Sequence, residues 1–256
     1  MQLELNPNRF FRTHILCITT LTAAYVATQV LQSCGHQRLL GLVALFDLNA
    51  EHNVPSFFSA IALLFAGGLM FLAGEASVRQ GIALSRYWQA LAMIFVFLAI
   101  DEECSIHETI GQTLRVGYNS SSAAWHYSWV FLYLPFVLAI GLACLPFLRR
   151  LPAATRNALV LAGCLFVGGA AGLEMLAGFI AQRFGDSWWY RIEVIAEENC
   201  EMLGVAILIR GVLAYVTQLQ FGLAMTPGEH AAPTDEEREH PGTRTARWQA
   251  PSRSRY

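Results

Sequence analysis

Six long runs of apolar residues, separated by short charged or polar segments, dominate the chain. They span residues 14–32, 56–74, 87–102, 128–148, 158–180 and 192–215. Runs of about 20 apolar residues match the thickness of a bilayer core. Helices are expected because lipid offers no partner for unpaired backbone groups. The third run is short because its last turn is charged, and we expect its helix to continue through Glu108. The pattern predicts an all-α, polytopic transmembrane bundle of about six spans.

Composition and charge indicate the same class of protein. Apolar residues make up 55% of the 256 residues, charged residues only 14%, and the mean hydropathy is +0.41. A soluble globular protein carries more charge than this. The net charge is −2, and all 17 basic residues are Arg without forming a basic face, so nucleic acid is excluded as a partner. The six Cys form no CxxC pair, which argues against a disulfide scaffold or a thiolate zinc site.

The distribution of Arg predicts the orientation of the spans. With the N-terminus in the cytoplasm, the cytoplasmic segments hold twelve Arg, the opposite side holds four, and Arg210 lies inside the last span. Cytoplasmic loops of membrane proteins carry the excess of basic residues. We therefore expect a cytoplasmic N-terminus at 1–13, a transmembrane domain at 14–222 and a cytoplasmic tail at 223–256. The tail is rich in Pro, Glu and Arg and is expected to be disordered.

The segment 37–55, between the first two spans, has its own character. Its start is apolar enough to lie in the exoplasmic interface of the membrane. Its second half alternates Asp47, Asn49, Glu51 and Asn53, which have the oxygen donors of a calcium loop. The Gly and the closing Glu of an EF-hand are missing, so this match is weak.

Acidic residues in or next to the spans are the most informative feature, because charge inside a bilayer is costly and normally functional. The third run ends in Asp101, Glu102, Glu103, Cys104, Ser105, Ile106, His107 and Glu108, the fifth carries Glu174, and the sixth carries Glu193, Glu197, Glu198 and Glu201. In the orientation above, all three acidic stretches fall in the outer third of the membrane. On a continuous helix, Asp101, Cys104 and Glu108 share a face, with His107 beside them. The Gly-rich segment before Glu174 allows another helix to approach closely.

Two motifs resemble those of a known group of proteins. LFDLNAEHNVPSFFS precedes the second span, and LAIDEECSIHE ends the third. They resemble the motifs LFDLDxExNxPxxFS and SxDExxxxHE of an uncharacterised group of bacterial multipass membrane proteins, with the same number and order of spans. The matching positions are Asp47, Glu51, Asn53, Pro55, Phe58, Ser59, Asp101, Glu102, His107 and Glu108. The resemblance favours the bacterial inner (plasma) membrane and singles out Asp101, Glu102, His107 and Glu108, but implies no activity.

The donor types favour a metal centre. A site of carboxylate oxygens with one His suits iron or manganese, or else zinc. The predicted metal ligands are Asp101, Glu102, His107, Glu108, Glu174, Glu197, Glu198 and Glu201. Such a set is similar to the di-iron sites of ferritin-like bundles, although their Glu-x-x-His motif is missing here. An enzyme of this kind would oxidise or hydrolyse a lipid-like or small-molecule substrate, with membrane lipid as its surroundings.

Two alternatives stay open at this point. Intramembrane carboxylates and His also form the relays of proton- or cation-coupled transporters. Against transport, the acids gather on one side, and no internal repeat or pair of broken helices marks a site at the midplane. The second alternative is a structural or interaction role, with the acids at solvated helix ends. Acidic residues at a helix C-terminus oppose the macrodipole, which argues against solvation alone. Arg210 is either a counter-ion of the acids or reaches toward the inner surface.

Overall fold

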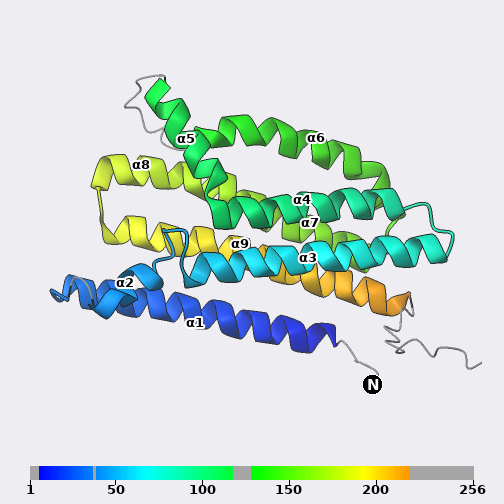
Figure 1. Cartoon of the computed structure of the whole chain (residues 1–256), viewed down its shortest axis with the longest axis horizontal. Helices are drawn as coiled ribbons and strands as arrows, with labels where there is room; N and C mark the ends of the chain where they lie inside the picture. The colour runs from blue at the N-terminus through cyan, green and yellow to red at the C-terminus, as the bar shows by residue number, and fades with distance from the viewer. Residues whose placement is uncertain (1–5, 37–38, 118–127, 220–256) are drawn as a thin grey trace, which may run out of the picture. The chain divides into compact units, whose positions relative to one another are not determined.

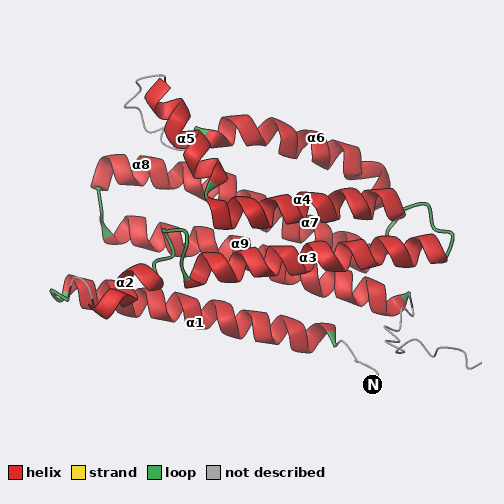
Figure 2. Ribbon diagram, viewed as in Figure 1, coloured by secondary structure: helices red, strands yellow, loops and turns green. Residues whose placement is uncertain are grey.

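The structure, a computed structural model, describes residues 6–36, 39–117 and 128–219, and every element in these ranges is helical. The expected tail at 223–256 lies outside the described residues. Figures 1 and 2 show the elements in chain order. They are α1 (Pro7–Ser33), a 3-10 turn (Leu39–Gly41), α2 (Leu42–Leu45), α3 (Val54–Arg79), α4 (Ser85–Cys104), α5 (Ile106–Gly117), α6 (Trp129–Arg150), α7 (Ala153–Val167), the π-helix η3 (Gly168–Leu173), α8 (Glu174–Phe184) and α9 (Trp188–Gln218). The predicted all-α class is confirmed.

Five helical segments of the described chain are long and apolar enough to cross a membrane. These are Pro7–Ser33, Val54–Arg79, Trp129–Arg150, Ala153–Phe184 and Trp188–Gln218. The predicted span 87–102 corresponds to α4, which packs along α3. Its last turn holds Asp101, Glu102 and Glu103, so its composition is more polar than that of the other five.

Polar residues at the helix starts explain where several of these helices begin. The side chain of Asn53 accepts a hydrogen bond from the backbone of Ser56, whose hydroxyl accepts one from the backbone of Asn53. This reciprocal arrangement satisfies two donors that a helix start otherwise leaves unpaired. The side chain of Asn6 caps α1 by accepting from the backbone of Asn8 and Arg9, and that of Ser187 caps α9 by accepting from Tyr190.

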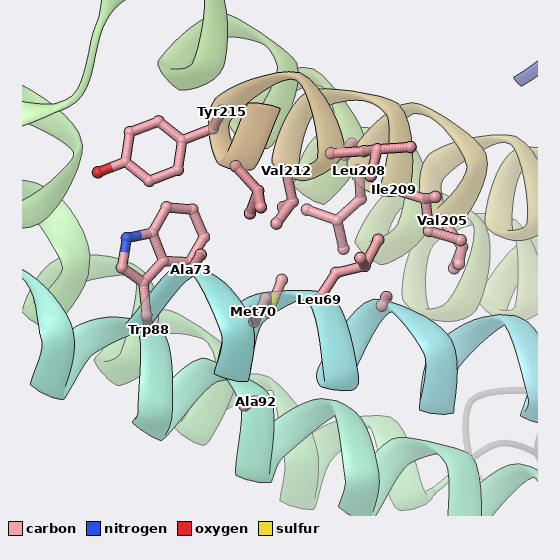
Figure 3. Close-up of a cluster of buried hydrophobic side chains, with 14 of the residues drawn as sticks. Leu69, Met70, Ala73, Trp88, Ala92, Val205, Leu208, Ile209, Val212 and Tyr215 are labelled. Atoms are coloured by element: carbon pink, nitrogen blue, oxygen red, sulfur yellow. The ribbon is translucent and has the colours of Figure 1, made fainter. Parts of the chain in front are cut away.

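Helix α9 forms the centre of the packing and contacts α1, α3, α7 and α8. Figure 3 shows its apolar residues, among them Ile209 and Val212, facing Met70 and Trp88 from α3 and α4. Gly204 brings α7 close, because a Cβ there would lie 2.9 Å from the backbone oxygen of Ala162. Small residues at such crossings allow close helix packing in membranes.

The sequence prediction for the end of the third span is wrong. The helix does not continue through Glu108, because α4 ends at Cys104 and Ser105 adopts a left-handed conformation with φ of 51°. A new helix, α5, begins at Ile106. The face expected to join Asp101, Cys104 and Glu108 therefore does not exist, and Cys104 is exposed. The break separates His107 and Glu108 from the axis of α4.

Arg210 is not a counter-ion of the acidic residues. Its Nε donates a hydrogen bond of 3.1 Å to Oδ1 of Asn8, and its guanidinium lies over the ring of Phe11. Both partners belong to the first turns of α1, and Arg210 lies in the second half of α9. Arg210 therefore interacts at the end of the bundle opposite the start of α9, where the acidic residues lie.

Candidate functional site

A cavity of about 460 Å³ lies at the end of the bundle where α3 and α9 begin and α4 ends. We call it the acid cavity. It is lined by the loop before α3 and by residues of α3 to α9 and of η3. All eight residues predicted as metal ligands line it: Asp101, Glu102, His107, Glu108, Glu174, Glu197, Glu198 and Glu201. Glu51, from the loop before α3, joins them.

The acid cavity carries a large excess of acidic groups. Eight carboxyl groups line it, and His107 is the sole basic side chain among its lining residues. The carboxyl groups come from the loop before α3 and from α4, α5, α8 and α9. Ionised groups that are this close and partly removed from water repel one another unless protons, cations or basic side chains compensate them. The cavity therefore favours protons or a positively charged guest.

Asp101 and His107 are joined across the break between α4 and α5. One oxygen of the buried Asp101 accepts the backbone N–H of His107 at 3.0 Å, and the other lies 3.1 Å from its ring Nδ1. The hydroxyl of Tyr133, from α6, donates a third hydrogen bond to Asp101 at 3.3 Å. The carboxylate thus lies at the N-terminus of α5, where negative charge is favourable. The break removes the unfavourable placement that a continuous helix would have imposed.

The second ring nitrogen of His107 faces another carboxyl group. Its Nε2 lies 3.5 Å from Oε1 of Glu51. Burial lowers the pKa of His107, but the hydrogen bond and charge of Asp101 and the charge of Glu51 outweigh burial and raise it to about 9. Burial raises the pKa of Glu51 to about 8, against the attraction of His107. Both ring nitrogens of His107 therefore face carboxyl groups, and these two acids favour the protonated form of the ring.

Trp129 connects Glu174 to the same group. Its indole Nε1 donates a hydrogen bond of 2.8 Å to Oε1 of Glu174, which is buried. The indole ring also packs edge-on against the ring of His107, with 4.9 Å between centroids. Because an indole N–H is a donor only, this contact holds one oxygen of Glu174 in place. Side chains of α5, α6 and α8 are thereby fixed relative to one another.

The π-helix η3 passes close to the acidic stripe of α9. A Cβ at Gly169 would lie 2.8 Å from Cγ of Glu201 and 3.0 Å from the backbone oxygen of Glu197. Only glycine fits at this distance, so the predicted role of the Gly-rich segment in close approach agrees with the structure. A π-helix inside an α-helix is rare and often marks a functional site. Here it places the segment just before Glu174 against the acidic stripe of α9.

Several acidic positions of the sequence do not belong to the cavity. Glu103 and Glu193 are not among its lining residues, although Glu193 lies on the stripe with Glu197 and Glu201. Ser105 lies 3.5 Å from Nδ1 of His52. Asn49 accepts a hydrogen bond from Tyr190 of α9, and Asn53 donates hydrogen bonds to the backbone of Asp47 and Ala50 within the loop. These side chains do not form a calcium loop.

Sequence reasoning did not select Glu51, Tyr133 or Trp129 as site residues. Glu51 belongs to the first of the two motifs, and its place in that motif was the one sequence feature that could have marked it as a site residue. Tyr133 and Trp129 lie in an apolar run whose aromatic residues fit an interfacial belt equally well. Their place in the site follows only from the contacts that α6 makes with Asp101 of α4, His107 of α5 and Glu174 of α8.

No three described His, Cys, Asp or Glu side chains are arranged to hold one metal ion. The carboxyl groups surround a volume and do not converge on one point. Oxygen donors of this kind suit hard divalent cations such as Mg²⁺ or Mn²⁺. A metal ion in the cavity would therefore require side-chain rearrangement, and metal binding stays a prediction.

A model of one protein family, described as a domain of unknown function (DUF8692), matches residues 15–216. The chain belongs to this family. The match includes every residue that lines the acid cavity. Neither a search of curated proteins nor a search of solved structures gave a match. The family description agrees with the resemblance to a group without known activity and leaves the site chemistry as the guide to function.

Proposed function

We propose that the acid cavity is the functional site of a membrane-embedded enzyme and that it binds a cation. The observation that carries this proposal is the charge of the cavity, where eight carboxyl groups meet a single basic side chain. Intramembrane acids on several helices are costly and persist where function needs them. A structural role as solvated helix ends would not require the acids of five parts of the chain to line one cavity.

The proposed location follows from the Arg distribution. With both termini in the cytoplasm, the acid cavity lies in the outer third of a bacterial inner membrane, and α4 forms a sixth span beside α3. The cavity then faces the outer leaflet. A lipid-like substrate of that leaflet would reach the site without crossing the membrane.

A divalent metal is the first candidate for the cation. Glu102 of α4 and Glu198 and Glu201 of α9 line the cavity and would supply the oxygen donors, so two helices would share the metal site. Iron, manganese or zinc in such a site would activate a water molecule or a substrate oxygen. His107, held between Asp101 and Glu51, would orient these two acids and carry a proton. The reaction class that fits is oxidation or hydrolysis of a lipid-like substrate.

Metal content of the purified protein tests this proposal. We expect stoichiometric metal by mass spectrometry in the detergent-purified wild type and its loss in the double variant Glu198→Gln, Glu201→Gln. Glu75→Gln is the matched control, because Glu75 is an acid in α3 that does not line the cavity. Equal metal content in all three folded proteins, or none in the wild type, would contradict a metal centre.

A second candidate is proton- or cation-coupled transport. Its support is the continuous series of contacts from Glu51 through His107 and Asp101 to Tyr133. Chains of acids and His carry protons in pumps and transporters. Proton flux into liposomes containing the protein, abolished by Asp101→Asn, would favour this function over an enzyme.

A further inference from the structure

The acid cavity has an apolar part on the side toward the middle of the helices. We call it the apolar floor; it consists of Leu63, Leu98, Leu134, Val137, Phe166 and Val167. Leu98 precedes Glu102 by one turn of α4, and Val137 follows Tyr133 by one turn of α6. At 1.5 Å per residue, one turn displaces a side chain by about 6 Å along the helix axis. A ligand in this cavity therefore meets apolar side chains beyond the acids, with Glu102 and Glu201 at the boundary beside Leu63 and Phe166.

Helix α6 covers the apolar floor only loosely. It is held near its two ends by the buried Trp129 and Val130 and by the buried Phe147. Between these points every residue from 131 to 146 is at least partly exposed, including those that face the cavity. Leu134 lines the cavity and is 37% exposed. A helix that packed tightly against its neighbours would bury one face along its whole length.

We propose that the ligand of the acid cavity is an amphipathic amine of the outer leaflet. Its ammonium group lies among the carboxyl groups, its hydrocarbon chain lies on the apolar floor, and it enters from the membrane beside α6. This inference rests on the proposed function, because it assigns a substrate class to the same cavity.

Charge complementarity is the reason for choosing an amine. Eight carboxyl groups and a single basic side chain, His107, line the cavity, so a net negative charge builds up as these acids ionise. An anionic headgroup would add to the repulsion, whereas an ammonium group donates hydrogen bonds and balances charge. Pockets of about 300–1,000 Å³ hold drug-sized ligands, and the cavity of about 460 Å³ falls in this range.

The test compares four small probes with the whole protein in phosphatidylcholine nanodiscs. Octylamine carries both features, octanol and octanoate share its chain but not its ammonium group, and butylamine shares the ammonium group but not the chain. A ligand that binds only the folded state raises the unfolding temperature. We expect octylamine to raise Tm by at least about 2 °C, and the other three probes to have no comparable effect.

Single substitutions in α6 show where octylamine binds. Val137→Trp fills the apolar floor and should abolish the octylamine shift, whereas Leu138→Trp, on the exposed neighbouring position, should retain it. If Val137→Trp fails to fold, Glu198→Gln replaces it, and the advantage of octylamine over octanol should shrink. An equal shift with octanol, or with butylamine, would overturn the inference, and so would a full shift in Val137→Trp.

The outcome separates this inference from the proposed function. Metal content is measured in the same wild-type sample. Metal that depends on Glu198 and Glu201, without a selective octylamine shift, would overturn the amine ligand and leave the metal centre standing. A selective octylamine shift in a metal-free protein would support the amine ligand and overturn the metal cofactor.

Discussion

The carboxylate of Asp101 accepts hydrogen bonds from both the backbone N–H and the ring Nδ1 of His107, across the break between α4 and α5. This contact decides how the acid cavity is built. It fixes the start of α5 and turns the second nitrogen of His107 toward Glu51. It also explains why an acid lies at the end of α4, where the helix dipole alone would disfavour it.

Loss of the Asp101 carboxylate should destabilise the protein. Asp101→Ala removes the acceptor of three hydrogen bonds and leaves the partly buried ring of His107 without its main partner. Hydrogen bonds to charged groups are worth roughly 1.5–3 kcal/mol each, so we expect a clearly lower unfolding temperature. Asp186→Ala is the control, because the Asp186 side chain is 76% exposed and its pair with Arg191 should matter little. Equal, small effects of both variants would show that the contact does not stabilise the fold.

Gly169 should tolerate no side chain. In Gly169→Ala the new Cβ meets Glu201 and the backbone of Glu197, and overpacking of this kind costs roughly 1–3 kcal/mol. The variant should unfold at a lower temperature and lose metal. Gly168→Ala provides the matched control in the neighbouring position, where nothing lies within 4 Å of the new atom. Unchanged behaviour of Gly169→Ala would mean that η3 and α9 are farther apart than the structure shows.

The indole N–H of Trp129 should matter more than its ring. Trp129→Phe keeps an aromatic ring beside His107 but leaves the buried Glu174 without its donor. An unsatisfied buried polar group costs about 1–3 kcal/mol, more if it is charged. Thermal unfolding measures this loss, and Trp189→Phe, at a position 67% exposed, should be near neutral. Equal stability of the two variants would exclude a structural role for the Trp129–Glu174 hydrogen bond.

Stability of the metal-free protein should fall as pH rises from about 5 to about 9. The pKa of His107 is raised from 6.5 to about 9, so its stabilising effect is complete below pH 6.5 and is lost up to pH 9. The pKa of Glu51 is raised from 4.5 to about 8, so its ionisation also costs stability as pH increases over this interval. Both contributions have the same sign by linkage.

Two variants separate the contributions to this pH profile. Unfolding temperatures are measured with a chelator present. Compared with the wild type, the temperature should decline less steeply above pH 6.5 in His107→Gln, and less steeply below pH 8 in Glu51→Gln. A wild-type profile that is flat or rises over the whole interval would contradict the arrangement of these two groups.

Much of the fold could be predicted because a helix that spans a bilayer needs about 20 mostly apolar residues. The apolar runs correspond to the long helices, and the helical stripe of Glu197 and Glu201 lies in the cavity as a continuous α9 requires. The placement of Glu174 opposite this stripe followed from the order and direction of the spans. The Gly-rich segment before Glu174 signalled the close approach at Gly169.

The break at Ser105 could not be predicted from local pattern. Neither Gly nor Pro stands there, and serine rarely adopts positive φ. The conformation is held by contacts made elsewhere, above all the capping of α5 by Asp101. The participation of Glu51 and Tyr133 depends in the same way on long-range packing, which brings the loop before α3 and one face of α6 to His107.

We infer that the acid cavity binds a cation through the carboxyl groups of α4 and α9. Titration of the chelator-treated protein in nanodiscs with Mn²⁺, followed by electron paramagnetic resonance of the free ion, tests it most directly. We predict saturable, stoichiometric binding in the wild type and in Glu75→Gln, and its loss in the Glu198→Gln, Glu201→Gln double variant. Equally weak, non-saturating binding in all three folded proteins would contradict the claim.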